Sequence, residues 1–460
     1  MATNRPGCRL AWKPAQGRVA DERPFRMQVE KSRMSRTTLT PVALVLATAA
    51  ALALAGCSTA PRPTATGGEV SSMQPTAHAT RTQGPVALLV PLTGPYGAIG
   101  QSIEKAVKLA FSAPGAPRLD VENTGGTAAG AASAAHNAIG KGAGLILGPL
   151  TMAEARAVTP IAQSAGVNVL AFTNDDSVAR PGIWPLGISP DQQVGRVVSY
   201  AIESGRTRTA AILPDNLFGR LMAAALRRTT ARLGAPPPHI GYYSASFSSL
   251  NATTRSISQF DSRGAGLMSR IRAARDEDSA AGRRLAAKLR SEPVPPPPFD
   301  ALLLGATSED LAELQTFLPY YEAGPPQVQL MGPALWSSRA RAMATHEVLR
   351  GAIYAAPDPS AGLPFNQKFE ATYGGVTPPS IDKVAFDAAA ISVLAAHEGG
   401  YKTSVLTASS GFSGTDGPLR LLPNGHVERG LAVFRIEPNG PKVVSPAPQT
   451  LPSPAPSPNA

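Results

Sequence analysis

The chain has 460 residues, enough for two domains with additional segments, and its apolar content of 43% is sufficient for extensive hydrophobic cores. The net charge of +11 is concentrated at the N-terminus, where the first 56 residues hold nine of the 43 Lys and Arg residues and three of the 32 Asp and Glu residues. The rest of the chain carries an ordinary surface charge, so we exclude a nucleic-acid partner.

Residues 40–55 (TPVALVLATAAALALA) form an apolar stretch. Its length is typical of the apolar core of a secretory signal and is short for a membrane span. Arg33 and Arg36 precede it, and it ends in the residues LAGC at 54–57. This combination resembles the bacterial lipobox, and the resemblance implies cleavage before Cys57 and lipid attachment to that cysteine. A buried helix that ends in a chance cysteine is the alternative. Acyl chains on a cysteine hold a protein firmly to a membrane.

The segments on either side of the lipobox follow from this interpretation. We expect residues 34–56 to be the signal peptide and residues 1–33 to be an upstream mis-start or unstructured. Ser58 stands where many such lipoproteins carry the aspartate that retains them in the inner membrane, so the resemblance favours the periplasmic leaflet of the outer membrane. Residues 57–83 begin at the lipidated cysteine, are rich in Pro, Thr and Ser, and predict a flexible tether.

The folded part is expected to begin with a strand, a glycine-containing loop and a helix. The run VALLV at 86–90 is apolar without interruption, as in a buried parallel strand. The loop LTGPYGAIG at 92–100 leads into apolar residues at helical spacing as far as Phe111. Such a loop directs free backbone N–H groups at one place, which suits an anion or a carboxylate, so we predict one wall of a ligand cleft. Its candidate residues are Thr93, Gly94 and Tyr96.

Strands and helices alternate in the next part of the chain, with turn-forming residues after each strand. Strands are predicted at 118–123, 145–147 and 167–172, and helices at 127–139, 153–165 and 192–202. The alternation predicts an α/β fold with parallel sheets, in which ligands bind at the carboxyl ends of the strands. The candidate residues at those ends are Leu150, Thr151, Thr173 and Asn174. Helix capping is an equally weighted role for Thr93 and for the polar members of this set.

A second alternation follows. Strands are predicted at 210–213, 240–243, 299–304 and 328–331, and helices at 220–233, 309–318 and 384–398. Residues 244–298 are less regular and contain helical stretches at 266–275 and 280–290, while residues 414–436 resemble a hairpin. The Pro- and Ser-rich residues 437–460 are expected to be disordered. Further candidate cleft residues are Asn216, Ala306, Ala334 and Trp336.

Three blocks of sequence carry a family resemblance. They are VPLTGPYGAIGQSIEKAVKLA at 90–110, LILGPLTMAEARAVTPIAQSAGVNVLAF at 145–172, and FDALLLGATSEDLAEL with VQLMGP between 299 and 333. These resemble the type I periplasmic-binding family, in its leucine/isoleucine/valine-binding branch, over residues 84–436. The resemblance implies two lobes, each a parallel sheet flanked by helices, joined by crossing strands, with a small-molecule ligand between them. Lobe 1 would be residues 84–204 and 337–400, and lobe 2 would be residues 205–336 and 401–436.

The resemblance also bears on the ligand. In members that bind amino acids, first-lobe hydroxyls hold the carboxylate, and a second-lobe acid balances the ammonium, which is costly to bury unpaired. Ala334 stands where that acid is expected, and Thr151-Met152 stand where a serine pair is common. The α-amino-acid site is therefore incomplete by this comparison, although Asp215 or Glu309 are alternative sources of the acid.

Two further segments favour a more specific function. Residues 317–338 (FLPYYEAGPPQVQLMGPALWSS) and 411–436 (GFSGTDGPLRLLPNGHVERGLAVFRI) resemble the penicillin-binding-protein activator lipoproteins. These carry the same fold on an outer-membrane anchor and stimulate a peptidoglycan synthase. We therefore expect a non-catalytic lipoprotein that regulates peptidoglycan synthesis. The alternative is the substrate-binding component of an ABC transporter for branched-chain amino acids or related small molecules, with an ABC permease as its partner.

The sequence contains no pattern that indicates catalysis, a cofactor or a metal. The glycines between residues 94 and 100 are spaced GxxGxxG rather than GxGxxG, which argues against a nucleotide site. The common hydrolase motifs are missing, and the six histidines are dispersed. Cys8 and Cys57 have no metal-ligand spacing. We expect no enzyme activity, no cofactor and no metal site.

Overall fold

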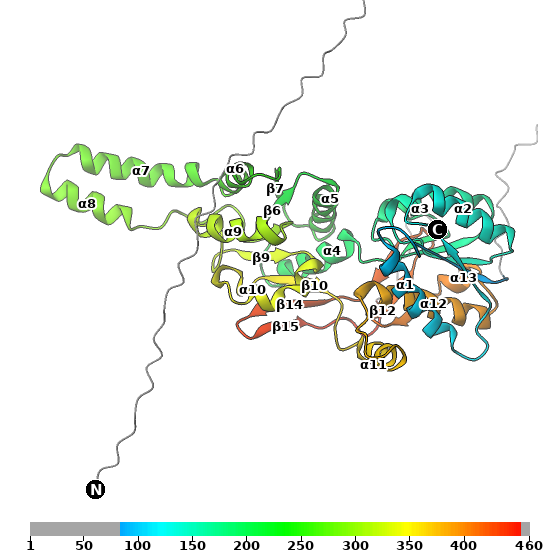
Figure 1. Cartoon of the computed structure of the whole chain (residues 1–460). Coiled ribbons are helices and arrows are strands. Elements are labelled where there is room, and N and C mark those ends of the chain that lie inside the picture. Colours follow the sequence, from blue (N-terminus) through cyan, green and yellow to red (C-terminus); the bar gives the residue numbers. More distant parts are fainter. Residues whose placement is uncertain (1–82, 452–460) are drawn as a thin grey trace, which may run out of the picture. The chain divides into compact units, whose positions relative to one another are not determined.

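The computed structural model describes residues 83–451. The expected signal peptide, Cys57 and nearly all of the expected tether lie outside the described residues, as do residues 452–460, so our statements about them remain predictions. Among the described residues, no helix combines the length and the apolar character needed to cross a membrane. The predicted α/β fold class is confirmed, since two mainly parallel sheets are each flanked by helices (Figure 1).

The first sheet is wholly parallel, in the order β2-β1-β3-β4-β5. Its strands are β1 (Val86–Val90), β2 (Leu119–Asn123), β3 (Leu145–Leu147), β4 (Asn168–Ala171) and β5 (Ile183–Pro185). One face packs against α1 (Gly97–Phe111) and α12 (Ser380–His397). The other packs against α2 (Ala128–Gly140) and α3 (Met152–Ser164). Because both faces are covered, the central strands β1 and β3 are short apolar runs, which is how they were predicted.

The second sheet has the order β15-β14-β10-β9-β8-β6-β7, with β14 and β15 antiparallel to their neighbours. Its strands are β6 (Thr209–Pro214), β7 (His239–Tyr243), β8 (Ala301–Leu304), β9 (Gln329–Gly332), β10 (Ile353–Ala356), β14 (Ala432–Glu437) and β15 (Gly440–Ser445). One face is covered by α4 (Pro190–Glu203) and α5 (Leu217–Arg232). The opposite face holds the largest core and is covered by α6 (Phe247–Ile257), α9 (Ser308–Tyr320), η2 (Ala334–Ser338), α10 (Ala340–Met343) and η3 (Glu347–Leu349).

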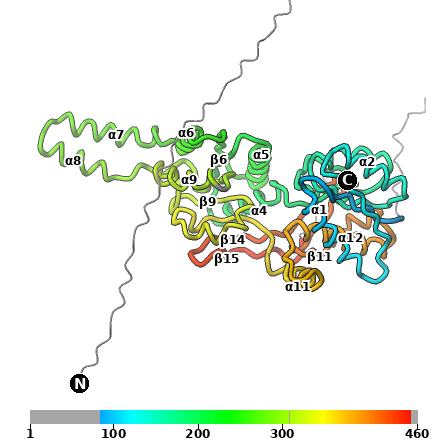
Figure 2. Tube along the Cα trace, in the orientation of Figure 1, coloured from blue at the N-terminus to red at the C-terminus, as the bar shows by residue number. Residues whose placement is uncertain are grey.

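The remaining elements complete lobe 1, apart from one helical pair on lobe 2. A small antiparallel sheet in the order β11-β12-β13 packs into the same core as α12. The lobe 1 elements are η1 (Asp176–Val178), α11 (Leu363–Thr372), α13 (Thr403–Leu406), β11 (Phe412–Gly414), β12 (Gly417–Leu421) and β13 (Val427–Arg429). The helical pair consists of α7 (Phe260–Asp276) and α8 (Ala280–Arg290), which project from lobe 2 as a hairpin (Figure 2).

The structure divides the chain between the lobes differently from the sequence-based boundaries. The chain crosses near residues 187–189, 357–362 and 430–431, not near 204, 336 and 400. The apolar stripe of α4 shares a core with β6, so this helix belongs to lobe 2. Residues 340–356 also lie in lobe 2, whereas β12 and β13 lie in lobe 1. An amphipathic pattern shows that a helix covers a sheet but not which of two sheets it covers, and the predicted boundaries were wrong for that reason.

The expectation of disorder from residue 437 is also wrong for part of the tail. Residues Gly440–Ser445 form β15, which pairs with β14 through Arg435 opposite Lys442 and Phe434 opposite Val443. The Ser445 hydroxyl accepts a 2.6 Å hydrogen bond from Arg196 on α4. Two adjacent valines supply strand-forming side chains within a Pro- and Ser-rich segment, and composition alone hides this local preference.

The less regular segment 244–298 contains three helices. The stretches predicted at 266–275 and 280–290 are confirmed as α7 and α8, although α7 begins earlier, at Phe260. Before them, α6 packs on the lobe 2 core through Leu250.

Candidate functional site

The loop between β1 and α1 is held tightly against its own strand. A Cβ atom placed on Gly100 would lie 1.9 Å from the carbonyl oxygen of Pro91, so only glycine allows the helix to approach so closely. Gly94 has φ of +78°, a backbone conformation that favours glycine. Tyr96 precedes the helix without a side-chain cap, and it is 42% exposed. The loop therefore presents Gly94 and Tyr96 to solvent at the carboxyl end of β1.

Asn123, which we did not predict, fixes this loop from the end of the neighbouring strand. Its Oδ1 accepts hydrogen bonds of 2.9 Å from the backbone N–H groups of Leu92 and Gly125. Its Nδ2 donates a 3.0 Å hydrogen bond to Oγ1 of Thr93. The Thr93 hydroxyl thus has a side-chain partner within the protein, and one donor remains on that hydroxyl for a bound molecule. The position of Asn123 at the end of a predicted strand was the one feature of the sequence that could have indicated this role.

The α3 N-terminus is satisfied by its own chain. Thr151 caps the helix by accepting from the N–H of Glu154, and Glu154 accepts a 2.9 Å hydrogen bond from the N–H of Thr151. The Thr124 hydroxyl also donates to the Glu154 carboxylate, which is fully buried. A carboxylate of the protein therefore occupies the position where a helix end attracts an anion. Leu150 beside it packs partly into the lobe 1 core.

The turn after β4 carries two acidic residues. Thr173 is buried, and its hydroxyl accepts a 3.2 Å hydrogen bond from the N–H of Asp175, while Asn174 is exposed. Asp175 forms a 3.3 Å ion pair with Arg156. Desolvation raises the pKa of Asp176, and a hydrogen bond from Ser189 opposes that shift. Among the lobe 1 candidates, Asn174 has the most freely available polar side chain.

The acidic alternatives in lobe 2 are not placed to balance a buried ammonium. Asn216 caps α5 by accepting a 3.0 Å hydrogen bond from the N–H of Gly219. The side chain of Asp215 is 61% exposed and forms a 2.9 Å ion pair with Arg220. Glu309 is exposed in the first turn of α9. A solvated acid binds a cation weakly, because water screens the attraction.

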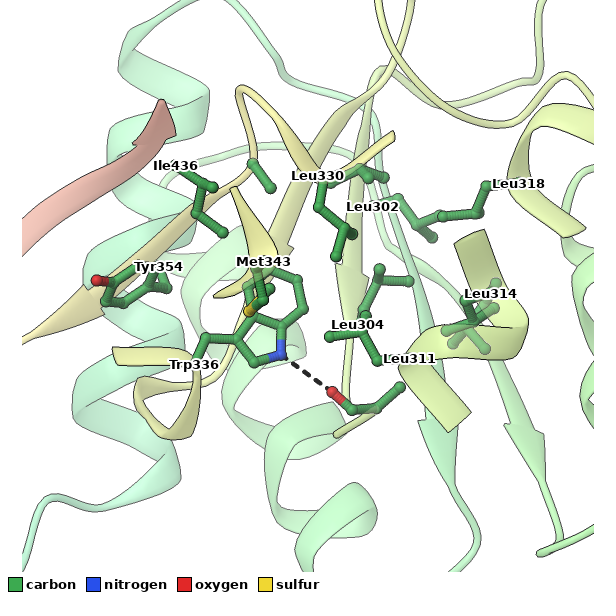
Figure 3. Close-up of a cluster of buried hydrophobic side chains, with 14 of the residues drawn as sticks. Leu302, Leu304, Leu311, Leu314, Leu318, Leu330, Trp336, Met343, Tyr354 and Ile436 are labelled. Carbon is green, nitrogen blue, oxygen red and sulfur yellow. Dashed lines mark hydrogen bonds between the residues drawn. The ribbon is translucent and has the colours of Figure 1, made fainter. Parts of the chain in front are cut away.

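Trp336 and Ala306 belong to the lobe 2 core. Figure 3 shows the indole of Trp336 among the buried side chains of this core, next to Met343. Its Nε1 donates a 3.0 Å hydrogen bond to the carbonyl oxygen of Ala306, and both residues are buried. A Cβ on Gly332 would lie 2.3 Å from the ring, so the glycine makes room for the indole to fold back over β9. Their side chains therefore serve packing rather than a cleft wall, which corrects the prediction.

Ala334 is partly buried, and it forms a hydrogen bond through its backbone, since its methyl side chain has no polar group. Its N–H donates a 2.6 Å hydrogen bond to Oε1 of Gln193 on α4, a side chain that is only 5% exposed. Gln193 was not predicted, because a glutamine on an amphipathic helix reads as an ordinary surface residue. The position where the family resemblance places an acid is thus neutral and internally hydrogen-bonded.

A buried charged pair lies beside the third crossing between the lobes. Arg429, at the end of β13, donates a 3.0 Å hydrogen bond to the carbonyl oxygen of Leu186, which precedes the first crossing. The same guanidinium lies 3.8 Å from Asp387 on α12, with both side chains buried. Burial raises the pKa of Asp387 to about 6 against the opposing attraction of Arg429. Sequence reasoning missed this pair, whose members are distant in the chain.

Two cavities in the described part of the chain lie away from these residues. One, of about 440 Å³, lies beside α3 and η1 and is lined by residues that include Arg156 and Arg180. The other, of about 480 Å³, lies between residues 358–361, the β11–β12 hairpin and residues 447–451. Neither cavity is lined by any predicted cleft residue. Within residues 83–451, no three His, Cys, Asp or Glu side chains are grouped to hold a metal ion.

Comparison with known proteins agrees with this architecture. A family model described as periplasmic binding protein matches residues 85–441. A branched-chain amino acid ABC transporter ligand-binding protein from Burkholderia xenovorans superposes with a TM-score of 0.56 and 17% identity, covering 79% of this chain and 95% of that one. No curated protein sequence matches the chain significantly.

A second group of solved structures has a different description. The C-domain of LpoA from Haemophilus influenzae, described as a regulator of PBP1A, superposes with a TM-score of 0.55 and 17% identity, covering 78% of this chain and 100% of that domain. Full-length LpoA gives a TM-score of 0.56 and 18% identity, and the match covers 80% of this chain but 60% of that protein. At these identities, both likenesses concern the fold alone.

Proposed function

Because this chain belongs to the periplasmic binding protein family, we propose that it is a non-catalytic envelope lipoprotein that regulates peptidoglycan synthesis through contact with a penicillin-binding protein. Members of this family are periplasmic proteins whose fold binds small molecules, so we expect the chain outside the cytoplasm. The proposed anchor is a lipid on Cys57, and the proposed location is the periplasmic leaflet of the outer membrane. Replacement of that residue (Cys57→Ser) is expected to release the protein from the membrane fraction, and continued sedimentation with membranes would contradict the anchor.

The state of Ala334 carries the proposal. An amino-acid receptor needs a counter-charge for the ligand ammonium, because an unpaired buried charge costs several kcal/mol. Ala334 has no charge, and its N–H is bound to the neutral Gln193. The acids named as alternatives, Asp215 and Glu309, are exposed. These features support a binding fold whose function depends on contact with a protein rather than on an amino-acid ligand, and the fold of LpoA provides a precedent.

The alternative function is the substrate-binding component of an ABC transporter. It is favoured by the likeness in fold to a branched-chain amino acid ABC transporter ligand-binding protein and by the exposed polar side chains of Thr93 and Asn174, which follow strands of the parallel sheet. In that case the lobes would close on a ligand, and the closed state would dock to a permease.

Thermal unfolding in the presence of amino acids separates the two functions. A ligand at one hundred times its dissociation constant stabilises the folded state by about 2.7 kcal/mol, which raises the melting temperature of a receptor measurably. We expect no shift with any of the twenty amino acids at millimolar concentration. A shift that saturates in the micromolar range would overturn the regulatory proposal in favour of transport.

A further inference from the structure

The helical pair α7–α8, residues 260–290, is called the arm here. It projects from lobe 2 between α6 and β8 (Figure 1). α7 has 17 residues, which corresponds to a length of about 25 Å. The hydrophobic cluster of the arm is its own and consists of Ile271, Ala274, Ala286 and Leu289, with Leu267 packed against them. The arm is therefore held by contacts between its two helices and by its junction with the rest of lobe 2.

This cluster is small for a helical hairpin. Two of its four buried side chains are alanines, and a buried Leu or Ile contributes about 2 kcal/mol. A Cβ on Gly282 would lie 2.3 Å from the carbonyl oxygen of Ala274, so the helices approach closely where α8 begins. Short helices with so little packing are marginal in water. An arm of this kind is expected to gain stability from a partner that covers it.

One face of the arm is basic. On α7, Met268 follows the partly buried Leu267, and Arg272 and Arg275 each follow a buried residue by one position. On α8, Arg283 and Arg290 do the same. In an antiparallel helix pair, the positions that follow the interface residues on both helices lie on the same face. These five side chains therefore form one surface, which is called the basic face here.

The charges of the basic face are mostly uncompensated. Within residues 83–451, the guanidinium groups of Arg272, Arg275 and Arg290 make no ion pair or hydrogen bond, whereas Arg283 pairs with Asp278 at 3.3 Å. Elsewhere on the arm, Arg270 pairs with Glu292 at 3.0 Å. The arm as a whole carries seven Arg and one Lys against four Asp and Glu. Three of the four arginines of the basic face thus carry a charge that no acidic group of the described residues balances, and an acidic partner surface would complement them.

The composition of the arm favours a protein as that complement. Protein interfaces are enriched in Arg, Met and aromatic residues and depleted in Lys. Met268 is 59% exposed on the basic face, and Tyr320, whose ring stacks on Phe260 at the base of the arm, is 69% exposed. Arg also binds carboxylates through two parallel hydrogen bonds, which Lys does not. An anionic lipid surface requires no such preference for Arg over Lys.

We propose that the basic face of the arm is a docking surface for the acidic surface of a partner protein. The inference rests on the proposed function, because the partner used to test it is a class A penicillin-binding protein of the same organism. The guanidinium groups of Arg272 and Arg275 meet carboxylates of the partner, and Met268, one turn before Arg272, supplies an apolar contact with the partner. Ionic contact of this kind weakens as salt screens the charges.

The test is a binding titration of the mature chain against the purified penicillin-binding protein. The double variant Arg272→Glu/Arg275→Glu is expected to bind at least about tenfold more weakly than the unaltered chain, as for charge pairs at interfaces. The matched control is Arg227→Glu/Arg341→Glu, which changes the net charge equally at exposed positions of α5 and α10 and is expected to bind normally. Circular dichroism verifies that each variant is folded.

The possible results separate this inference from the proposed function. Binding by the unaltered chain that the arm variant retains would overturn the inference and leave the proposed function intact. No binding by the unaltered chain would overturn both. If the charge-reversed arm unfolds, the variant Arg272→Gln/Arg275→Gln keeps the helix propensity and must still weaken binding. Binding to phosphatidylglycerol vesicles that the arm variant loses, with protein binding unchanged, would assign the arm to a membrane and overturn the inference.

Discussion

Single residues determine how charge is buried where the chain passes between the lobes. Asp387 lies in a buried pair with Arg429, and its Oδ1 also accepts a 2.7 Å hydrogen bond from the N–H of Thr415. Asp416 lies nearby and forms its own 3.3 Å ion pair with Lys383. Desolvation outweighs these favourable contacts, so ionisation of Asp387 is less favourable in the folded protein than in the unfolded chain.

A pH dependence follows from this raised pKa. Folding raises the pKa of Asp387 from its ordinary value of about 3.9 to about 6, so between these values the folded state binds more protons than the unfolded state. The contribution of this residue to the free energy of unfolding therefore falls as pH rises, by about 2 kcal/mol between pH 4 and pH 7.

The variant Asp387→Asn isolates this effect from that of other carboxylates. Urea unfolding at pH 4 and pH 7 is expected to show that the variant gains stability relative to the unaltered protein as pH rises. A difference between the two proteins that stays constant across this range would contradict a raised pKa in the folded state.

At the scale of elements, the sequence predicted what depends on local chemistry. The strands β1 and β3 and the helices α2 and α3 were predictable because uninterrupted apolar runs and helical spacing reflect burial directly. The cap of α3 was also readable, since Thr151 and Glu154 stand three residues apart. The hydrogen bonds of Asn123 and Gln193 were not, because each joins segments that only the folded chain brings together.

The contact between β1 and α1 gives a test at this scale. Gly100→Ala is expected to lower the free energy of unfolding by about 1–3 kcal/mol, because its Cβ would lie 1.9 Å from the Pro91 oxygen. A Cβ atom placed on Gly266 in α7 would have no heavy atom within 4 Å, so Gly266→Ala is expected to stabilise the protein by about 0.5–1 kcal/mol. Equal effects of the two variants in chemical unfolding would show that the close approach is absent.

At the scale of the whole molecule, the three sequence blocks that resemble the family predicted two lobes. The family model that matches residues 85–441 confirms the family. The assignment of segments to lobes was wrong for α4 and for β12. The apolar spacing of a helix or strand shows that one side is buried, but it does not show in which lobe that side is buried. The candidate cleft residues of lobe 1 follow strands, and their part in a cleft stays a prediction. Trp336 could not be placed from the sequence, because its position depends on the space left by Gly332.

The central claim is that this binding fold acts on a peptidoglycan synthase. It is tested most directly by measuring glycan polymerisation and peptide cross-linking by the purified class A penicillin-binding protein of the same organism, with and without the mature chain. We predict that a stoichiometric amount of the chain raises the rate of synthesis and that added amino acids do not alter the effect. A rate that is unchanged by the chain at saturating concentration would contradict the account.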